Sequence, residues 1–438
     1  MKKFLGFIFK LFLSLLFTLI LIELGLRLFP SVIPLDLLVF FHPEPKAQIA
    51  HSRGLPTRGW DTVPLERDDG GPELRILRPY TNIVWPIEDN GTINRVTMDE
   101  NGFCNPPENS YQRPTIDIIT LGDSFTTCHA VSAQETWTSQ LAAQTGLSAY
   151  NLGRVGIGIH EYLQIFKKFG LQKSPKLVIL NIYEGNDLRD AMEYYDYVHY
   201  KSEYNLQALF TSPTESADYL NSYFAELLGY YSYAFNLISA AVEYAQTNKI
   251  FELNPGPSSP RKTNFRYRLV FSEDDVVAFN PSNTDRDEVQ HAKLLQNKYE
   301  AINIGVELTI SAALSTFVQL AEQHNFIPVV SYTPSAHTAY AEHVVFDDPT
   351  LLDLMPLVSR DQRRFLKMQG EELGYIFIDL TPALQAATRA KGSQDLLYYR
   401  YDLHLTPAGH TVVAEALYTA LNDLGMITEL YPVNDASN

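Results

Sequence analysis

Short apolar runs alternate with helical patterns along two stretches of this chain. Strands buried on both faces of a parallel sheet read as continuous apolar runs, so we interpret Leu177–Tyr183 as a central strand. The spacing of Trp137 and Leu141 indicates a helix. Pro407–Leu421 is expected to form the closing helix. This alternation predicts an α/β fold, a three-layer α/β/α sandwich around a central parallel sheet. The predicted strands are Thr115–Leu121, Ala149–Leu152, Leu177–Tyr183, Phe326–Tyr332 and Tyr375–Asp379.

The segments outside this alternation divide the chain into parts. Within the second part, Ile83–Trp85 and Arg95–Thr97 read as short strands between turn signals. The α/β domain is interrupted by an insertion at about residues 190–300, and ten tyrosines lie from Tyr194 to Tyr233. For most of these tyrosines we favour packing in a lid or a membrane-facing surface. The alternative is a cleft that stacks sugar rings, lined by Tyr194, Tyr195, Tyr197 and Tyr200. The predicted parts are an anchor at 1–30, a tether with a small β extension at 31–113, the α/β domain at 114–425 and a C-terminal tail at 426–438.

The first segment is apolar enough to predict a membrane-crossing helix. From Phe4 to Ile22 only Lys10 is charged, and this is about the length that a helix needs to cross a bilayer. Lys2, Lys3 and Lys10 precede the main apolar run, so the positive-inside rule places the rest of the chain in the periplasm or the extracellular space. A cleaved signal peptide has a similar pattern, but no small-residue cleavage site follows soon after Ile22. We therefore expect a single-pass, uncleaved membrane anchor.

Composition and charge exclude several classes of protein. Of the 438 residues, 45% are hydrophobic and 19% are charged, which excludes a wholly disordered chain and a coiled coil. A formal net charge of -17 argues against general binding of nucleic acid. Two cysteines cannot form a cysteine-only zinc site, and we expect no metal and no cofactor. Outside the cytoplasm, Cys104 and Cys128 could form a disulfide or remain two buried thiols.

Three polar side chains have the chemistry of a nucleophile and its activating base. Ser124 follows a predicted buried strand, where a tight turn could present its hydroxyl at the start of the next helix. His404 is the candidate base, and Asp402 lies two residues before it, near enough to orient the imidazole. Ser124 could instead cap the helix, and His404 could be an ordinary loop residue. His410 is a rival base, but it is expected one turn into the closing helix, where packing is the simpler role.

Two further positions could stabilise a developing oxyanion. Gly156 lies in a glycine-rich turn after a predicted strand, and its N–H is unobstructed by a side chain. Asn186 follows Leu177–Tyr183 and offers a side-chain amide. Together with the N–H of Ser124 they would place three donors around one oxygen. The alternatives are a tight-turn glycine and an asparagine that closes the strand with a local turn.

Four short motifs containing these residues occur in order. With them the chain resembles the SGNH (GDSL-type) hydrolase superfamily, over roughly residues 115–190 and 301–421. The resemblance implies a flavodoxin-like α/β/α sandwich and serine esterase or acyl-transfer chemistry. It also implies Ser124 as nucleophile and oxyanion donor, Gly156 and Asn186 as the other oxyanion donors, and His404 with Asp402 as the rest of the triad. The motifs are Leu121-Gly122-Asp123-Ser124-Phe125, Asn151-Leu152-Gly153-Arg154-Val155-Gly156, Gly185-Asn186-Asp187 and Asp402-Leu403-His404.

Three positions depart from the pattern of that superfamily. Phe125 stands where the first motif usually has Leu, and Glu184 stands where the third usually begins with Gly. The carboxylate of Glu184 could repel an oxyanion unless it points away or pairs with an arginine. The Asp–His spacing is two residues rather than three, which resembles membrane-anchored relatives that act on acyl groups of polysaccharides. If Asp402 does not orient the base, Asp395 is the fallback.

These observations predict a membrane-anchored serine esterase that works through an acyl-enzyme on Ser124. The expected substrate is a small O-acyl ester, such as an acetyl group, on a glycan, a lipid or a small molecule. An O-acetyltransferase of an envelope or exopolysaccharide glycan would use the same triad. A non-catalytic, glycan-binding protein with the same fold is the alternative from a different class.

Overall fold

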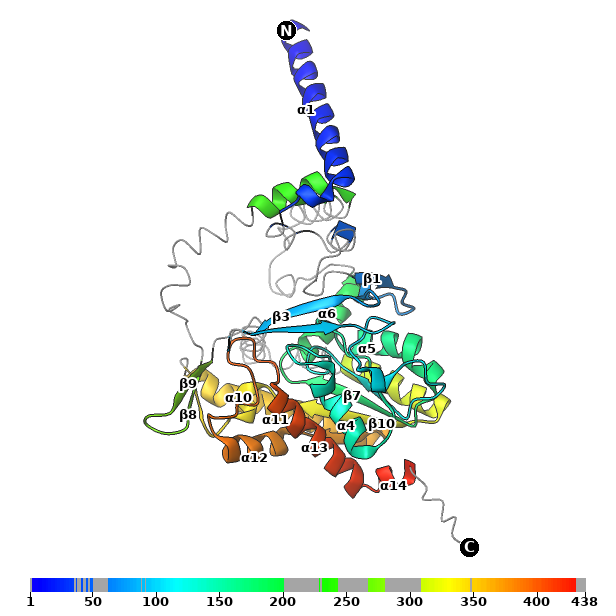
Figure 1. Cartoon of the computed structure of the whole chain (residues 1–438), viewed down its shortest axis with the longest axis vertical. Helices are drawn as coiled ribbons and strands as arrows, with labels where there is room; N and C mark the ends of the chain where they lie inside the picture. Colours follow the sequence, from blue (N-terminus) through cyan, green and yellow to red (C-terminus); the bar gives the residue numbers. More distant parts are fainter. Residues whose placement is uncertain are drawn as a thin grey trace. The chain divides into compact units, whose positions relative to one another are not determined.

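In the computed structural model the chain divides into two compact units (Figure 1). The first comprises Met1–Pro64, Thr81–Ile83 and Gln207–Thr263, and the second comprises Leu65–Tyr80, Val84–Leu206 and Asn264–Asn438. The described residues are 2–34, 37, 41, 45, 48–49, 62–87, 89–90, 92–200, 228, 231–242, 267–279, 309–346 and 349–430.

A five-stranded parallel sheet forms the centre of the second unit. Its strand order is β12-β10-β7-β5-β6. The central strand β7 pairs with β5 through Ile118 opposite Leu177 and with β10 through Val329 opposite Ile179. All seven residues of β7 are buried, so both faces of the sheet are covered, as its continuous apolar sequence predicts. The strands are β5 Ile118–Leu121, β6 Ala149–Asn151, β7 Leu177–Tyr183, β10 Ile327–Thr333 and β12 Ile376–Asp379.

The helices of this unit pack around the sheet. One large apolar cluster joins α4, α12 and α13 to the sheet, with Trp137, Leu384 and Val413 fully buried within it. The predicted closing helix is confirmed as α13, which begins with Pro407 in its first turn behind the N-cap Thr406. Residues 309–324 are also helical. The labelled helices are α4 Trp137–Thr145, α5 Ile159–Ile165, α6 Asp187–Tyr200, α10 Ala336–Ala339, α11 Thr350–Leu373, α12 Thr381–Lys391, α13 Pro407–Asp423 and α14 Met426–Leu430.

Smaller elements confirm some predictions and correct others. The short strands expected in the extension are present as β3 and β4, which pair with each other. A three-stranded antiparallel sheet of order β11-β8-β9 was not predicted, because its strands are short and β11 lies far from the other two in sequence. Residues 426–430 form a helix rather than a tail, since Met426 and Leu430 are buried in the apolar core. The remaining strands are β1 Thr62–Leu65, β2 Leu74–Leu77, β3 Asn82–Ile87, β4 Thr92–Thr97, β8 Tyr267–Val270, β9 Val276–Phe279 and β11 Val344–Phe346.

In the first unit, the N-terminal segment forms helix α1, Lys2–Leu28. Near its carboxyl end Glu23 accepts hydrogen bonds from the backbone N–H groups of Tyr233 and Ala234 and from the hydroxyl of Ser232. Leu26 is buried in the same cluster as Tyr233. Across the described part of the chain, no helix combines the length and the apolar character that crossing a membrane requires. The helix predicted at residues 1–30 is therefore present, and the predicted membrane anchor is not confirmed.

Most of the tyrosine-rich stretch lies outside the described residues. Of those described, Tyr194 stacks on His160 with 3.7 Å between ring centroids. Its hydroxyl donates to the carbonyl of Asp69 at 3.4 Å. This ring therefore packs within the second unit, and the interpretation of the stretch as a whole stays a prediction.

Candidate active site

Ser124 lies in a tight turn directly after β5. The carboxylate of Asp123 accepts a hydrogen bond from the N–H of Phe125 at 2.8 Å, and the carbonyl of Asp123 accepts one from Thr126 at 3.2 Å. A side chain at Gly122 would meet the hydroxyl of Thr126 at 2.1 Å, so only glycine fits there. The prediction that the next helix starts at Ser124 is wrong, because α4 begins only at Trp137. The serine is held by the turn and not by a helix terminus.

The hydroxyl of Ser124 meets the imidazole of His404. Ser124 Oγ lies 2.8 Å from His404 Nε2, although 280 residues separate them in sequence. His404 ends a turn in which the N–H of Tyr399 donates to the His404 carbonyl at 2.9 Å. Within this turn Leu403 has a φ of 62°, a left-handed conformation that few residues other than glycine adopt. The predicted nucleophile and the predicted base are thus within hydrogen-bond distance, as transfer of a proton between them requires.

Asp402 lies beside the predicted base His404, but its carboxylate is farther from the imidazole ring than a hydrogen bond allows. Its Oδ1 accepts the backbone N–H of His404 at 3.1 Å and lies 3.8 Å from the ring nitrogen His404 Nδ1. This second distance is an ion-pair contact rather than a hydrogen bond, and His404 Nδ1 is buried without a hydrogen-bond partner. Burial acts to raise the pKa of Asp402, but His129 and His404 hold it below its ordinary value. The fallback Asp395 pairs with Lys391 instead.

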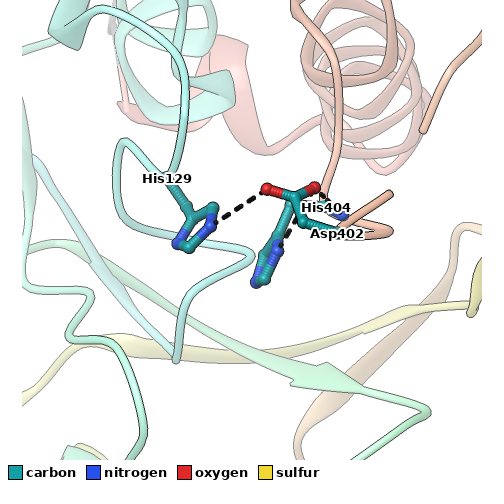
Figure 2. A group of neighbouring side chains, drawn as sticks. All are labelled: His129, Asp402 and His404. Atoms are coloured by element: carbon teal, nitrogen blue, oxygen red, sulfur yellow. Dashed lines mark hydrogen bonds and ion pairs between the residues drawn. The ribbon is translucent and has the colours of Figure 1, made fainter. Parts of the chain in front are cut away.

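His129 is a fourth member of this group that the sequence did not reveal. Its Nε2 lies 3.3 Å from Asp402 Oδ2, and its ring stacks on His404 with centroids 3.6 Å apart and planes 19° apart. Figure 2 shows the carboxylate of Asp402 beside the two neighbouring imidazoles, with a dashed line to each. His129 also lies against Trp85, at 4.1 Å between ring centroids. Burial and the nearby His404 lower the pKa of His129 to about 4, so it is neutral at pH 7.

The same three residues form the one group in the described part of the chain with the composition of a metal site. Ligand atoms of His129, Asp402 and His404 lie within 4.8 Å of one another. An imidazole binds a metal through a nitrogen lone pair that lies in the ring plane. Because the two rings stack nearly parallel, no single point lies in both planes at bonding distance. The arrangement fits a carboxylate shared by ring nitrogens of two imidazoles better than it fits a coordinated cation.

The candidate oxyanion donors follow the two strands that flank β5. Gly156 lies after β6 with a φ of 71°, is exposed, and has open space where a side chain would be. Asn186 lies between β7 and α6 and is buried, and its amide donates one N–H to Asp190 Oδ2 at 2.7 Å. Asp190 in turn pairs with Arg189 at 2.9 Å. The Asn186 amide has a second N–H with which it can serve another acceptor. The roles of Gly156 and Asn186 as oxyanion donors stay predictions.

Glu184, one of the departures from the family pattern, is bound in a buried network. Its Oε1 accepts the hydroxyls of Ser335 at 2.9 Å and Thr338 at 2.5 Å, and its Oε2 accepts that of Ser359 at 3.0 Å. His337 lies 3.5 Å away. Burial acts to raise the pKa of Glu184, but His337 and these hydroxyls lower it overall. The charge is therefore compensated within the protein, and no unpaired carboxylate results from this departure.

Two more acidic groups lie fully buried behind the turn. Burial raises the pKa of Asp123 to about 6, with the nearby charge of Asp190 acting in the same direction. Burial and the charge of Asp123 raise the pKa of Asp187 well above its ordinary value. Asp187 accepts hydrogen bonds from the hydroxyl of Tyr162 at 2.7 Å and from the N–H of Tyr183 at 2.8 Å. These contacts tie the start of α6 to the end of β7 and to α5.

The rival base His410 has a packing role. It is buried in α13, and its Nδ1 accepts the N–H of Trp137 at 3.2 Å. Burial lowers the pKa of His410 to about 3, with His404 and His129 acting in the same direction. The bond joins α13 to the first residue of α4, and so it fixes two helices rather than a nucleophile.

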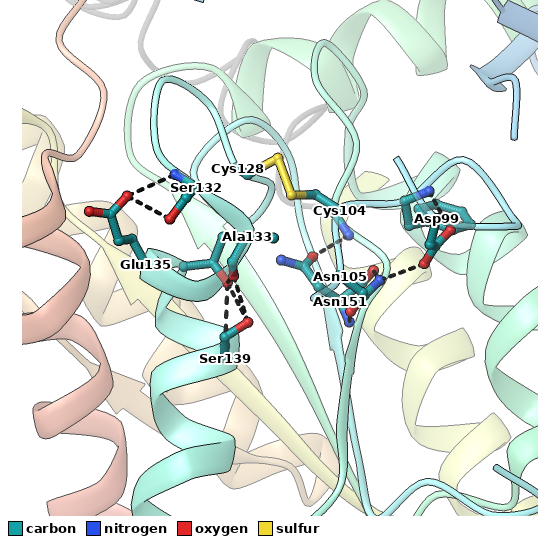
Figure 3. Close-up of a disulfide and its surroundings, with 12 residues drawn as sticks. Asp99, Cys104, Asn105, Cys128, Ser132, Ala133, Glu135, Ser139 and Asn151 are labelled. Atoms are coloured by element: carbon teal, nitrogen blue, oxygen red, sulfur yellow. Dashed lines mark hydrogen bonds between the residues drawn. A yellow bond between two sulfur atoms is a disulfide. The ribbon is translucent and has the colours of Figure 1, made fainter. Parts of the chain in front are cut away.

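A disulfide holds the segment that carries Ser124 and His129. Cys104 and Cys128 are bonded, with their Cα atoms 5.9 Å apart, which resolves the alternative left open by the sequence (Figure 3). Next to Cys104, the amide of Asn105 donates to the carbonyl of Asn151 at 3.0 Å, and its oxygen accepts the N–H of Asn151 at 2.8 Å. The extension is thereby joined both to the end of β6 and to the turn after β5.

Comparison with known proteins gives similarity to solved structures alone. No family model matches the chain, and no curated protein does. A lipolytic protein of the G-D-S-L family from Desulfitobacterium hafniense is 12% identical, with a TM-score of 0.33, over 70% of this chain and 100% of that one. An acetyl xylan esterase is 13% identical, with a TM-score of 0.34, over 70% of this chain and 100% of that one.

A variant of an acetyl-xylooligosaccharide esterase from Geobacillus stearothermophilus is 12% identical, with a TM-score of 0.33, over 72% of this chain and 96% of that one. At such identities and TM-scores, the function of the present chain has to be inferred from its own site.

Proposed function

We propose that this protein is a serine hydrolase that cleaves an O-acyl ester through an acyl-enzyme on Ser124. The observation that carries the proposal is the 2.8 Å contact between Ser124 Oγ and His404 Nε2, at the carboxyl edge of a parallel sheet. Open parallel sheets place their chemistry at this edge. A serine hydroxyl is a weak nucleophile until a base within hydrogen-bond reach accepts its proton.

The reaction follows from the geometry in two halves. Ser124 Oγ attacks the ester carbonyl while His404 Nε2 takes its proton, and the resulting oxyanion is bound by N–H donors of Ser124, Gly156 and Asn186. The C–O bond to the alcohol breaks as His404 returns the proton to the leaving oxygen. A water molecule, deprotonated by His404, then attacks the acyl-serine, which releases the acid and restores Ser124. Asp402 stabilises the imidazolium that forms in each half.

Two observations bear on the substrate and the compartment. Gly156 is exposed and faces open space, so an acyl group carried by a large molecule such as a glycan can reach this side of the site. The Cys104–Cys128 disulfide favours an oxidising compartment, because thiols are kept reduced in most cytosols. We therefore propose a small acyl ester, such as an acetyl ester on a glycan, as the substrate class, and a location outside the cytoplasm.

Hydrolysis of p-nitrophenyl acetate by the full chain and by two variants tests this function. Ser124→Ala removes the nucleophile and His404→Ala removes the base, so each should lower kcat by at least about a thousandfold. His343→Phe serves as the control with unchanged kcat, because it alters a histidine that packs against Phe271 outside this site. Retention of wild-type kcat by Ser124→Ala would exclude the proposed nucleophile.

A further inference from the structure

We propose that His129 is a positioning residue for this reaction, which holds Asp402 in place beside His404. The inference rests on the proposed function and adds a residue to its machinery. The two oxygens of Asp402 are divided between two imidazoles, with Oδ2 at 3.3 Å from His129 Nε2 and Oδ1 at 3.8 Å from His404 Nδ1. The carboxylate is therefore nearer to His129 than to the ring of the base that it must orient.

The surroundings of His129 determine which of its two ring nitrogens carries the hydrogen. Its Nδ1 is buried without a hydrogen-bond partner, and Nε2 faces the carboxylate of Asp402. A hydrogen on Nδ1 would leave a buried donor unpaired and would set a bare Nε2 lone pair against a carboxylate oxygen. The tautomer with the hydrogen on Nε2 avoids both costs. Neutral His129 thus donates to Asp402 and adds no second positive charge beside the imidazolium of His404.

Several independent contacts fix the ring of His129. The preceding residue, Cys128, is bonded to Cys104, and the following residue, Ala130, has a left-handed φ of 60°. The ring stacks on that of His404 and makes a tilted contact with Trp85. Side chains that must hold a geometry within a fraction of an ångström need such support. A donor fixed in this way restrains the carboxylate of Asp402, whose side chain is 39% exposed.

The consequence for catalysis concerns the orientation of the base. Asp402 can stabilise the imidazolium of His404 only while its carboxylate stays beside the Nδ1 edge of that ring. Without His129, this partly exposed carboxylate keeps the backbone N–H of His404 on Oδ1 but loses the contact at Oδ2, so it turns toward water more readily. We expect the loss to appear in kcat more than in KM, because it acts on a proton transfer and not on substrate binding.

Two substitutions separate hydrogen bonding from packing. His129→Phe keeps a stacked ring but has no N–H, whereas His129→Gln loses the ring but keeps an N–H donor near the position of Nε2. We expect His129→Phe to lower kcat for p-nitrophenyl acetate about tenfold, with KM within about twofold of wild type. His129→Gln should recover most of that loss. His343→Phe is the matched control, since it changes a histidine that packs against Phe271.

The pH profile of kcat/KM gives a readout that packing alone would not move. The ionisable groups that face His404 are Asp402, His129, His410 and Asp123. In His129→Phe the carboxylate of Asp402 lies beside the ring of His404 less of the time and favours the imidazolium less, so the acidic midpoint of kcat/KM should move to lower pH. His129→Gln should return it toward wild type.

The possible outcomes distinguish this inference from the function on which it rests. Wild-type kcat and pH profile in His129→Phe, with Ser124→Ala inactive, would overturn the role of His129 and leave the esterase in place. Equal losses in His129→Phe and His129→Gln, with matching falls in Tm, would assign His129 to packing and also overturn it. Wild-type activity in Ser124→Ala would remove the function itself.

Discussion

At the scale of single residues, strained backbone positions and buried ionisable groups lie close to the carboxylate of Asp402. Leu403, between Asp402 and His404, and Ala130, next to His129, both have left-handed backbones. Each such residue costs about 1 kcal/mol relative to an ordinary conformation. The short Asp–His spacing becomes possible because the left-handed Leu403 turns the chain, which brings the Asp402 side chain alongside the following histidine.

Asp123 gives a prediction about stability and pH. Its pKa of about 6 in the folded protein exceeds the ordinary value of 3.8, so this group favours folding below pH 4 and its contribution is lost as the pH rises through 6. A raised pKa of this size costs about 3 kcal/mol at pH 7. Asp123→Asn removes this ionisation, so we expect its Tm relative to wild type to be higher at about pH 7.5 than at about pH 4.5.

Thermal unfolding of the two proteins across this pH range measures that difference. His343→Phe, which changes no buried acid, should show a constant offset from wild type. If the Tm difference between Asp123→Asn and wild type is the same at both pH values, burial does not raise the pKa of Asp123 as expected.

Sequence could reveal the residues that follow a strand, but not those placed by a tertiary contact. Ser124 and His404 were found because each lies in a loop at the predicted active edge of the sheet, and the structure places them in contact. His129 has no local pattern that marks it, since only the fold brings it against Asp402. The hydrogen bond from the Asn186 amide to Asp190 could not be predicted either, because the two side chains meet only when the first turn of α6 forms.

At the scale of elements, the segment between β5 and α4 is the part of the site that was predicted least well. A helix was expected immediately after Ser124, but Ser132 and Glu135 form a capping box, and Thr136 caps α4 with its side chain. These start signals are in the sequence and delay the helix until Trp137. The intervening segment is held by the disulfide at Cys128.

Removal of this disulfide should weaken both stability and activity. The double substitution of Cys104 and Cys128 by Ser opens a loop with a sequence separation of 24, which predicts a loss of about 3 kcal/mol in the free energy of unfolding. We expect a lower kcat as well, because the bond holds the segment that carries Ser124 and His129. Chemical unfolding and p-nitrophenyl acetate turnover measure the two effects.

Reduction of the wild-type protein provides the control for the serine substitutions. Dithiothreitol should lower the stability of wild type and leave that of the double variant unchanged. If the variant unfolds at the same denaturant concentration as oxidised wild type, the bond does not constrain this segment.

The sheet itself was predicted well for a physical reason. The bounds of β7 agree with the apolar run Leu177–Tyr183, because a strand covered on both faces disfavours charged residues until it ends. The antiparallel strands β8, β9 and β11 were missed, since strands of three or four residues carry little periodicity and β11 joins β8 across 73 intervening residues, 271–343.

At the scale of the whole molecule, every residue of the proposed machinery belongs to the second compact unit. Ser124 and Asp402 come from opposite ends of that unit's sequence, and its central sheet brings their loops to one edge. The predicted sandwich is confirmed as far as its parallel sheet, with helices and apolar cores around it. The domain bounds and the compartment stay predictions, because they depend on more than the packing of this unit.

Covalent labelling of the full chain with a fluorophosphonate, located by mass spectrometry of its peptides, tests the central claim most directly. Such a reagent is attacked by an activated serine and leaves a stable phosphonyl adduct on its oxygen. We predict one adduct on Ser124 in wild type, a much slower reaction in His404→Ala and none in Ser124→Ala. An adduct on another residue in wild type, or undiminished labelling of Ser124→Ala, would contradict the account.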